Sequence, residues 1–390
     1  MPKKKIKYPY EYDPKTRRLA KIYTKKKIIA GLVNGIAIPV IFLAFLLYSG
    51  GAKYIELASQ GLIGNYYANV VLYGFMLISL MTLIQLPLRF YSGYIYDHKY
   101  RISNYNLGGW FRDFFKGLLI GYIIFMPLIL ALYYFISTQT LWWVYTGIFY
   151  AILFAFMSYI SPVIIMPFFY KVEPYRDKRQ IKRLLEMARK AGVGNIKNVF
   201  LAKESEKSKR ANAVFMGFGK TKRIVLFDNL TDNFTDDEVE TVVAHELGHY
   251  VGRDSLKFLL LETVKIFPVF FVIDIILRSY LGVFGIDNIA RVAGLPLFLL
   301  SLFAIDFLLM PLENAYSRSV ETRADLFALK MSKKPRAQIS AEKRLSDMDL
   351  IDESAHPLIE FILFSHPSTK KRIELVERLS KQKDKAGYRY

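Results

Sequence analysis

Two histidines and two acidic residues with short, regular spacings could together form a metal site. His245 and His249 flank Glu246 in the sequence His-Glu-Leu-Gly-His. Residues four apart lie on one face of a helix, so both imidazoles could bind one zinc ion while Glu246 lies beside a zinc-bound water. A zinc peptidase needs a third protein ligand, and Glu321 is the best candidate. Asp325 shares the helical face of Glu321 and could hold a ligand histidine.

A helix is predicted to carry the two histidines. Thr235, followed three residues later by Glu238, forms a capping box that begins a helix running through His245 and His249. Two histidines at this spacing can also occur by chance on the surface of an amphipathic helix. Because the predicted helix is the setting that the chemistry requires, we expect one zinc ion per chain and a metallopeptidase with Glu246 as its general base.

Composition indicates a membrane protein. The chain has 390 residues, of which 53% are hydrophobic, and a formal net charge of +20. Its apolar residues gather into long blocks, so we assign the positive charge to membrane orientation and lipid contact, and we expect no nucleic-acid partner. There is no cysteine, which excludes disulfides, thiolate zinc sites and cysteine nucleophiles. We expect a monomer that acts on a peptide or protein substrate.

Six stretches are long and apolar enough to cross a bilayer, which takes about 20 helical residues. They are residues 28–48, 67–87, 117–136, 144–169, 256–277 and 293–312. Lys and Arg are concentrated before the first stretch and between the second and third, which predicts that these segments, and by counting also the metal motif, are cytoplasmic. We expect a multi-pass protein of the cell membrane in a prokaryote, or of the endoplasmic reticulum in a eukaryote.

These patterns predict a mainly α, polytopic membrane protein with a cytoplasmic, zincin-like α+β catalytic unit. The expected parts are a basic cytoplasmic arm (1–27), a four-helix transmembrane region (28–169), a cytoplasmic α+β unit with the histidine-bearing helix (170–255), two further transmembrane helices (256–312) and a cytoplasmic helical region with the third zinc ligand (313–390). In the last part, residues 368–383 form a basic amphipathic helix whose charges we expect to face solvent or the membrane.

Inside the α+β unit, residues 177–191 have helical periodicity, and short strands are expected at 198–202, 213–218 and 223–227. The last two strands form a hairpin. A strand edge beside a zinc ion could pair with an extended peptide and bring its scissile carbonyl to the metal. Alternatively, the hairpin is only scaffold, since sheet edges are common and often merely protected.

Ordered blocks of residues are similar to the type I CAAX prenyl protease family, integral-membrane zinc endopeptidases that remove the C-terminal tripeptide of prenylated proteins. The blocks are residues 165–171, 208–218, 222–228, 245–249, 314–325 and 364–367. The resemblance implies a prenylated substrate and a large chamber enclosed by the membrane helices, of which the family usually has seven.

The resemblance also implies roles for individual residues. It implies metal ligation by His245, His249 and Glu321, catalysis by Glu246 and His366, substrate alignment by Asn212, Ala213 and Phe215, and support of the ligands by Asp325, Arg318 and Asn314. The ring nitrogens of His366 suit it to stabilise a developing oxyanion, although a His-Pro step can also be a plain turn.

Two other functions fit parts of the pattern. Bacterial heat-shock membrane proteases that clear damaged membrane proteins share the zinc blocks but have fewer spans before them. A non-enzymatic transporter with a structural zinc would explain the charged residues inside the predicted spans, because such residues face protein or water. These residues are Glu262, Lys265, Asp274 and Asp306, and the first two can form an ion pair one turn apart.

Overall fold

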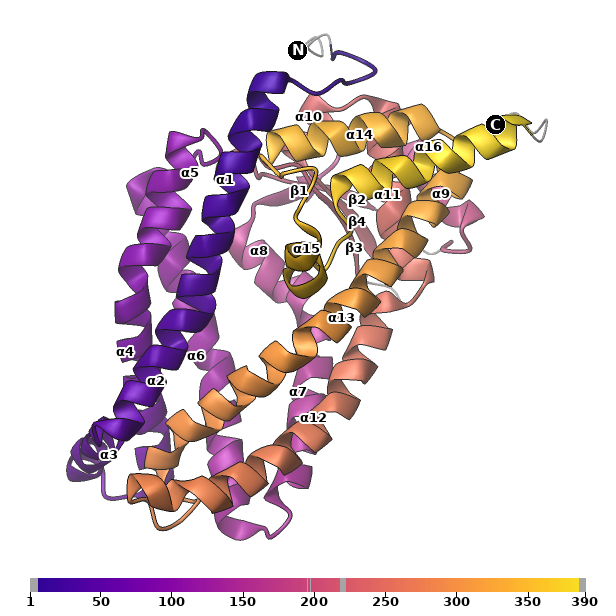
Figure 1. Cartoon of the computed structure of the whole chain (residues 1–390). Coiled ribbons are helices and arrows are strands. Elements are labelled where there is room, and N and C mark those ends of the chain that lie inside the picture. The colour runs from indigo at the N-terminus through magenta and orange to yellow at the C-terminus, as the bar shows by residue number, and fades with distance from the viewer. Residues whose placement is uncertain (1–5, 195, 197, 218–221, 386–390) are drawn as a thin grey trace.

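The computed structural model describes residues 6–194, 196, 198–217 and 222–385, and it is mainly helical, with a small sheet at one end (Figure 1). The helices of the first part are α1 (Pro14–Leu32), α2 (Ile38–Tyr48), α3 (Gly51–Leu62), α4 (Tyr66–Phe90), α5 (Tyr96–Lys99), α6 (Leu107–Thr138), α7 (Trp142–Ile160) and α8 (Met166–Phe169). Those of the second part are α9 (Lys178–Lys190), α10 (Asp228–Asn233), α11 (Asp236–Val251), α12 (Asp254–Tyr280), α13 (Leu295–Ser332), α14 (Pro335–Met348), α15 (Pro357–Leu363) and α16 (Thr369–Lys385). The strands are β1 (Val172–Pro174), β2 (Val199–Ala202), β3 (Ala213–Met216) and β4 (Arg223–Phe227).

Five helical segments in the described part of the chain are long and apolar enough to cross a membrane. They are Pro14–Tyr48, Tyr66–Lys99, Leu107–Thr138, Trp142–Ile160 and Val292–Ser332. Four of the six predicted spans lie within them, and a fifth, 144–169, overlaps Trp142–Ile160 but ends nine residues too far toward the C-terminus, because a π turn follows α7 at residues 161–165. The remaining predicted span, 256–277, lies in the 27-residue helix α12. Glu262, Lys265 and Asp274 interrupt the apolar sequence of α12, which therefore falls outside this group. The predicted class, a mainly α polytopic membrane protein, is confirmed.

Helix α13 connects the membrane region to the polar end of the molecule. It runs without interruption for 38 residues, from the apolar segment that begins at Leu295 to the polar turns that carry Glu321 and Asp325. Pro311 lies inside the helix, and residues 312–332 after it contain no further proline or glycine that would end the helix before the two acidic residues. One continuous helix therefore carries both acidic residues and the apolar segment of the membrane region.

The sheet has the strand order β1-β2-β4-β3. Strands β2 and β4 are parallel, whereas β3 pairs antiparallel with β4, with Val214 opposite Val225. The predicted pairing of the last two strands is confirmed, and their connection at 218–221 lies outside the described residues. The sequence did not predict β1 or α10. Within the described residues, β3 has no strand partner on its other side, so it is an edge strand.

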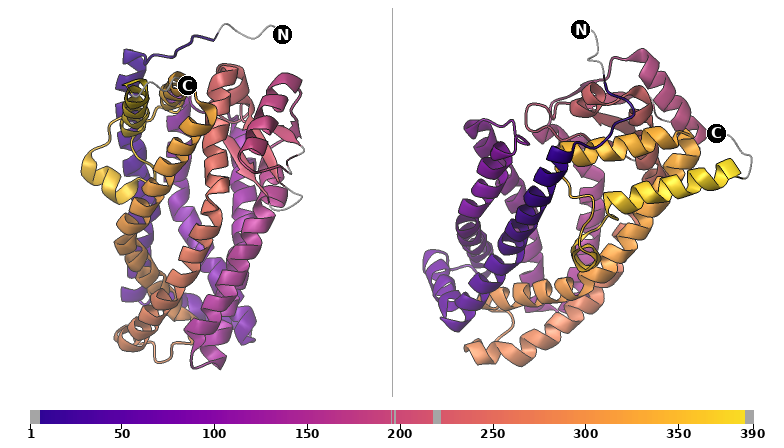
Figure 2. Two further views of the ribbon diagram at one scale, coloured as in Figure 1. Left: turned by 90° about the vertical axis from the view of Figure 1, so that its right-hand side faces the viewer. Right: turned by 45° about the horizontal axis from the view of Figure 1, so that its top comes forward.

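Two hydrophobic cores hold these parts together. One joins the membrane helices far from the sheet and includes Trp142, Phe270 and Phe298. The other lies under the sheet, where Leu226 and Leu247 pack with residues of α9, α10 and α13. Figure 2 shows the same division, with the long helices at one end and the sheet, α14 and α16 at the other.

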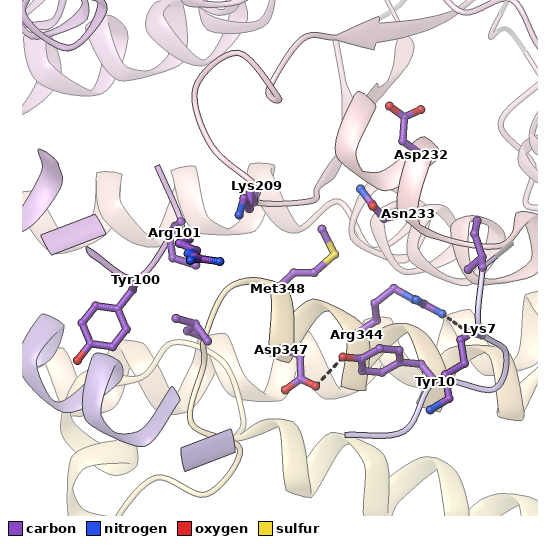
Figure 3. A pocket seen from close by; sticks show the side chains of 13 residues that line it. Lys7, Tyr10, Tyr100, Arg101, Lys209, Asp232, Asn233, Arg344, Asp347 and Met348 are labelled. Atoms are coloured by element: carbon purple, nitrogen blue, oxygen red, sulfur yellow. Dashed lines mark hydrogen bonds between the residues drawn. The ribbon is translucent and has the colours of Figure 1, made fainter. Parts of the chain in front are cut away.

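The N-terminal arm lies against helix α14, as Figure 3 shows from close by. The Tyr10 hydroxyl donates to Asp347 at 2.7 Å, and Arg344 donates to the carbonyl of Lys7 at 2.6 Å. Arg344 also forms a buried ion pair with Glu238 at 3.2 Å. The arm is thus connected through α14 to the first turn of α11.

Candidate metal centre

Helix α11 carries the two histidines of the motif, as predicted. The Thr235 hydroxyl accepts from the Glu238 amide at 3.3 Å, and the Glu238 carboxylate accepts from the Thr235 amide at 2.7 Å, so the predicted capping box is confirmed. His245 and His249 lie one turn apart on one face, with their ring centroids 4.7 Å apart. The local sequence therefore begins the helix and sets the spacing of both imidazoles.

A glycine allows α11 to approach α13 closely. A Cβ atom at Gly248 would lie 3.2 Å from the Ala324 Cα and 3.2 Å from the Phe327 Cβ. Both contacts are tighter than ordinary van der Waals packing, and backbone atoms at the contact give little room for adjustment. The missing side chain at Gly248 therefore lets α13 bring Glu321 beside the histidines.

His245, His249 and Glu321 place their potential ligand atoms, the two Nε2 atoms and the two carboxylate oxygens, close together. The His245 Nε2 atom lies 3.1 Å from His249 Nε2 and 3.2 Å from Glu321 Oε2, and His249 Nε2 lies 3.4 Å from Glu321 Oε1. Tetrahedral zinc with bonds of about 2.0–2.1 Å would separate its ligand atoms by about 3.3–3.4 Å. Glu321 Oε2 is buried and has no hydrogen-bond partner among the described residues. These atoms therefore fit a tetrahedral metal ion.

Asp325 holds His245 from the opposite side of the ring. Its carboxylate accepts from His245 Nδ1 at 2.9 Å, as predicted from the helical spacing of Glu321 and Asp325. Arg372 of α16 donates to both oxygens of Asp325, at 2.6 and 2.8 Å, and forms an ion pair with Glu342 at 2.8 Å. The expectation that the charges of this C-terminal helix face solvent or the membrane is wrong for Arg372, because it is turned inward to compensate buried carboxylates.

Asp254 holds His249 in the same way. This first residue of α12 accepts from His249 Nδ1 at 3.0 Å and forms an ion pair with Arg323 of α13. A carboxylate accepts hydrogen bonds only, so each histidine donates from Nδ1 and turns Nε2 toward Glu321, where Nε2 becomes a metal ligand once it has lost its proton. Two ring nitrogens and a carboxylate that converge in this way form a ligand set for a metal ion.

The pKa values of His245 and Glu246 are both raised, but for different reasons. Burial lowers the pKa of His245, but its hydrogen bonds to Asp325 and Glu321 outweigh that effect and raise the pKa to about 10. Metal binding at His245 must therefore displace a proton. Burial raises the pKa of Glu246, partly offset by the two neighbouring histidines. Within the described residues no side chain donates a hydrogen bond to the Glu246 carboxylate, which suits it to accept a proton from a reacting group.

The structure brings His366 to the site. Its Nε2 atom lies 3.2 Å from Glu321 Oε1, while its side chain is 61% exposed. Asn314 and Arg318 act on the segment that carries it, because Asn314 donates to the carbonyl of Ile362 at 2.6 Å and Arg318 donates to the carbonyl of Phe364 at 2.7 Å. These two residues thus hold the His366 segment, whereas Asp325 contacts a candidate ligand directly.

Strand β3 lies next to α11 and contains the residues expected to align a substrate. Phe215 packs against Tyr250 of α11, with ring centroids 4.3 Å apart, so its side chain is engaged inside the protein. Asn212 is exposed, and its side-chain oxygen accepts from the Ala213 amide at 2.8 Å. The Asn212 carbonyl accepts from the Phe227 amide of β4. Because backbone groups alternate along a strand, those of Ala213 and Phe215 face the open edge.

Two charged residues of the site were missed from the sequence. Asp254 follows His249 by five positions in a new helix, and Arg372 comes from the end of the chain. An acidic residue at the start of the helix after the motif was a usable signal, since ligand histidines need a partner for their second nitrogen. Arg372 has no comparable local signal, because only the packing of α16 against α13 brings it to Asp325.

Comparisons with known proteins agree with this arrangement. The model of peptidase family M48 matches residues 174–380, and the model described as CAAX prenyl protease N-terminal, five membrane helices, matches residues 6–171. The chain belongs to peptidase family M48. It is therefore a multi-pass membrane metallopeptidase, and the predicted family and enzyme class are confirmed.

Related proteins align with most of this M48 chain. It is 29% identical over 343 residues to the uncharacterized metalloprotease YhfN of Bacillus subtilis, covering 86% of this chain and 80% of that protein. It is 30% identical over 335 residues to CAAX prenyl protease 1 of Saccharomyces cerevisiae, covering 79% and 72%. The crystal structure of S. mikatae Ste24p matches with a TM-score of 0.80 and 25% identity, covering 93% of this chain and 89% of that one.

These matches decide between the functions considered from the sequence. Membership of a peptidase family sets aside the non-enzymatic transporter. The charged residues that suggested a transporter form ion pairs within the protein, and the predicted pair of Glu262 and Lys265 is present at 2.7 Å. The match of the N-terminal half to the CAAX prenyl protease model favours that group over the heat-shock membrane proteases.

Proposed function

We propose that this M48 peptidase uses one zinc ion, held by His245, His249 and Glu321. The observation that carries the proposal is that the two Nε2 atoms lie 3.1 Å apart and each lies 3.2–3.4 Å from one oxygen of the Glu321 carboxylate, separations close to those between the ligand atoms of tetrahedral zinc. Two histidines and one carboxylate leave a fourth position for a substrate or water, as catalytic zinc sites do. Metal analysis of the purified protein tests this, and a metal content well below one per chain would contradict it.

In the proposed mechanism, Glu246 is the general base. When bound, zinc would polarise the scissile carbonyl and lower the pKa of the attacking water. Glu246 takes a proton from that water and passes it to the leaving amine. His366 lies beside Glu321 on a segment held by Arg318 and Asn314, where it donates a hydrogen bond to the developing oxyanion. Asp325 and Asp254 keep the ligand histidines oriented throughout.

We propose that the substrate binds as an additional strand beside β3. The outward-facing backbone groups of Ala213 and Phe215 would pair with an extended peptide, and α11 lies directly alongside. The Asn212 side chain already accepts the hydrogen bond of the Ala213 amide. A bound peptide would therefore begin to pair with β3 beyond that amide. Recognition through backbone groups predicts loose side-chain preference at the cleaved bond.

We further propose that prenylated proteins are substrates and that the active site faces the cytoplasm. The first proposal is supported by the similarity to proteins named CAAX prenyl protease 1, and the second by the distribution of Lys and Arg around the first spans. The deciding experiment compares turnover of matched farnesylated and unmodified peptides by the purified protein. A large preference for the farnesylated peptide supports the proposal, and equal turnover contradicts it.

A further inference from the structure

A cavity of about 660 Å³ lies among the membrane helices, and residues of α2, α4, α6, α7, α12 and α13 line it. Most of the lining side chains are leucine, isoleucine, phenylalanine or other apolar residues. The charged residues of the lining are Arg89, Glu262, Lys265 and Asp306. A mostly apolar cavity of this size with a few charged groups is typical of a ligand site, in which the charges set the orientation of the ligand.

Three of these charged residues already form one cluster. Lys265 forms ion pairs with Glu262 at 2.7 Å and Asp306 at 3.7 Å, and with Glu313 at 2.7 Å. Three carboxylates surround one ammonium group, so the α12 and α13 side of the cavity is anionic. This side repels an anionic ligand group and leaves the opposite side, formed by α4, as the place where such a group would bind (Figure 1).

Arg89 of α4 is the charged lining residue without an ionic partner. Its Nη2 donates to the neutral side-chain oxygen of Gln85 at 2.7 Å, and no carboxylate of the described residues forms an ion pair with it. A guanidinium in a membrane-spanning helix is costly unless it pairs or faces water. Arg89 lies in the last turn of α4, on the cavity wall, where its charge is available to an anionic group that enters the cavity from outside the chain.

The local backbone holds this guanidinium in place. The helix widens to a π turn at 33–37, where the Ile38 amide donates to Val33 instead of Asn34. Pro39 has no amide to donate, so the Asn34 carbonyl is free of the helix and accepts from Gln85 at 2.6 Å. Gln85 is buried and is thereby oriented with its oxygen toward Arg89. Such π turns occur often at functional sites, and the one at residues 33–37 positions Arg89 through Gln85.

We propose that Arg89 binds the free C-terminal carboxylate of a peptide substrate whose last residues lie in this cavity. The inference rests on the proposed peptidase function of the chain. A planar guanidinium pairs with a carboxylate through two parallel hydrogen bonds, and the C-terminal carboxylate is the anion that every unmodified peptide carries. The apolar lining accommodates uncharged side chains next to it. Arg89 is thus a specificity-determining residue that recognises the end of the substrate chain.

The test measures binding of one peptide in two forms, with a free C-terminal carboxylate and with a C-terminal amide. The full-length, metal-loaded protein carries Glu246→Gln so that the peptide is not consumed. We expect the amide to bind about 10- to 100-fold more weakly, as for loss of a charge-assisted pair. Adding Arg89→Gln should abolish the difference, and Arg89→Lys should restore part of it. Arg112→Gln, an exposed arginine of α6 outside the cavity lining, should leave the difference intact.

The comparison stays decisive if a variant is less stable, because both peptide forms are measured on the same preparation. The inference is overturned if the protein that retains Arg89 binds the carboxylate and amide peptides equally. It is also overturned if the Arg89→Gln protein still prefers the carboxylate peptide to the same extent. Failure of the protein with Glu246 to cleave any peptide would instead contradict the proposed function. In that case the ratio of the two binding constants still decides whether Arg89 reads a carboxylate.

Discussion

Asp254 accepts a hydrogen bond from His249 Nδ1 at 3.0 Å, and this contact joins the start of the 27-residue helix α12 to a candidate metal ligand. The same carboxylate forms an ion pair with Arg323, two residues beyond Glu321 on α13. Helices α11, α12 and α13 thus meet at one carboxylate. Removing the Asp254 carboxylate would leave the His249 ring without its orienting hydrogen bond, while all three candidate metal ligands stay in place.

We expect Asp254→Ala to lower metal affinity by about 10- to 100-fold, as for other residues that orient ligand histidines. Competition with a chelator measures this directly. Lys257→Ala provides the control, because Lys257 lies one turn away on the same helix and is 3.9 Å from the Asp254 carboxylate. Unchanged metal affinity in Asp254→Ala would refute the orienting role.

Glu246 and Glu321 should respond differently to substitution. Glu246→Gln should keep its metal and lose about 10²- to 10⁴-fold in turnover, because only the proton acceptor is removed. Glu321→Ala should lose both activity and metal, since two histidines alone do not complete the site. Metal content and peptide turnover are measured on the same samples. Full metal occupancy in Glu321→Ala would disprove its assignment as a ligand.

Asn212→Ala should reduce peptide turnover while metal content stays unchanged. The substitution removes the oxygen that accepts from the Ala213 amide at 2.8 Å, which alters the donors along the β3 edge. Turnover, metal content and melting temperature are compared with those of the unchanged protein. If turnover stays normal while the melting temperature falls, Asn212 is only a turn residue.

Stability should depend on pH through Asp349. Burial raises the pKa of this carboxyl to about 7, and the nearby Arg210 only partly offsets that effect. The folded protein therefore binds a proton that the unfolded chain, with a pKa near 3.9, has already lost, so the free energy of unfolding falls as pH rises from about 4 to 7. The loss is up to about 4 kcal/mol. Asp349→Asn should flatten the dependence of melting temperature on pH between about 4 and 7, and an unchanged slope would contradict this assignment.

Single cysteines test the orientation in the membrane, since the chain has none of its own. Lys190, at the end of α9, is exposed near the sheet, and the Asp287 side chain, between α12 and α13, is 82% exposed. Lys190→Cys should react with an impermeant thiol reagent from the cytoplasmic side and Asp287→Cys from the other side. Reaction of both from one side would overturn the proposed topology.

Local sequence determined the helix that carries the motif and most of the membrane helices. The capping box of Thr235 and Glu238 and the spacing of His245 and His249 depend on hydrogen bonds and side-chain positions that repeat every three or four residues. Apolar runs of sufficient length likewise predict spans without knowledge of their neighbours. The charged helix α12 shows the limit of this criterion, because ion pairs formed with other residues, such as that of Lys265 with Glu313, accommodate its charges.

Tertiary structure alone decided which distant side chains complete the site. Arg372 reaches Asp325 because α16 packs against α13, and the Ala213–Met216 strand lies beside α11 because the sheet and that helix share one core. That Arg89 has no ionic partner among the described residues is likewise a property of the assembled helices. Such contacts join residues far apart in the chain, and their geometry depends on how whole helices pack, so no local periodicity in the sequence encodes them.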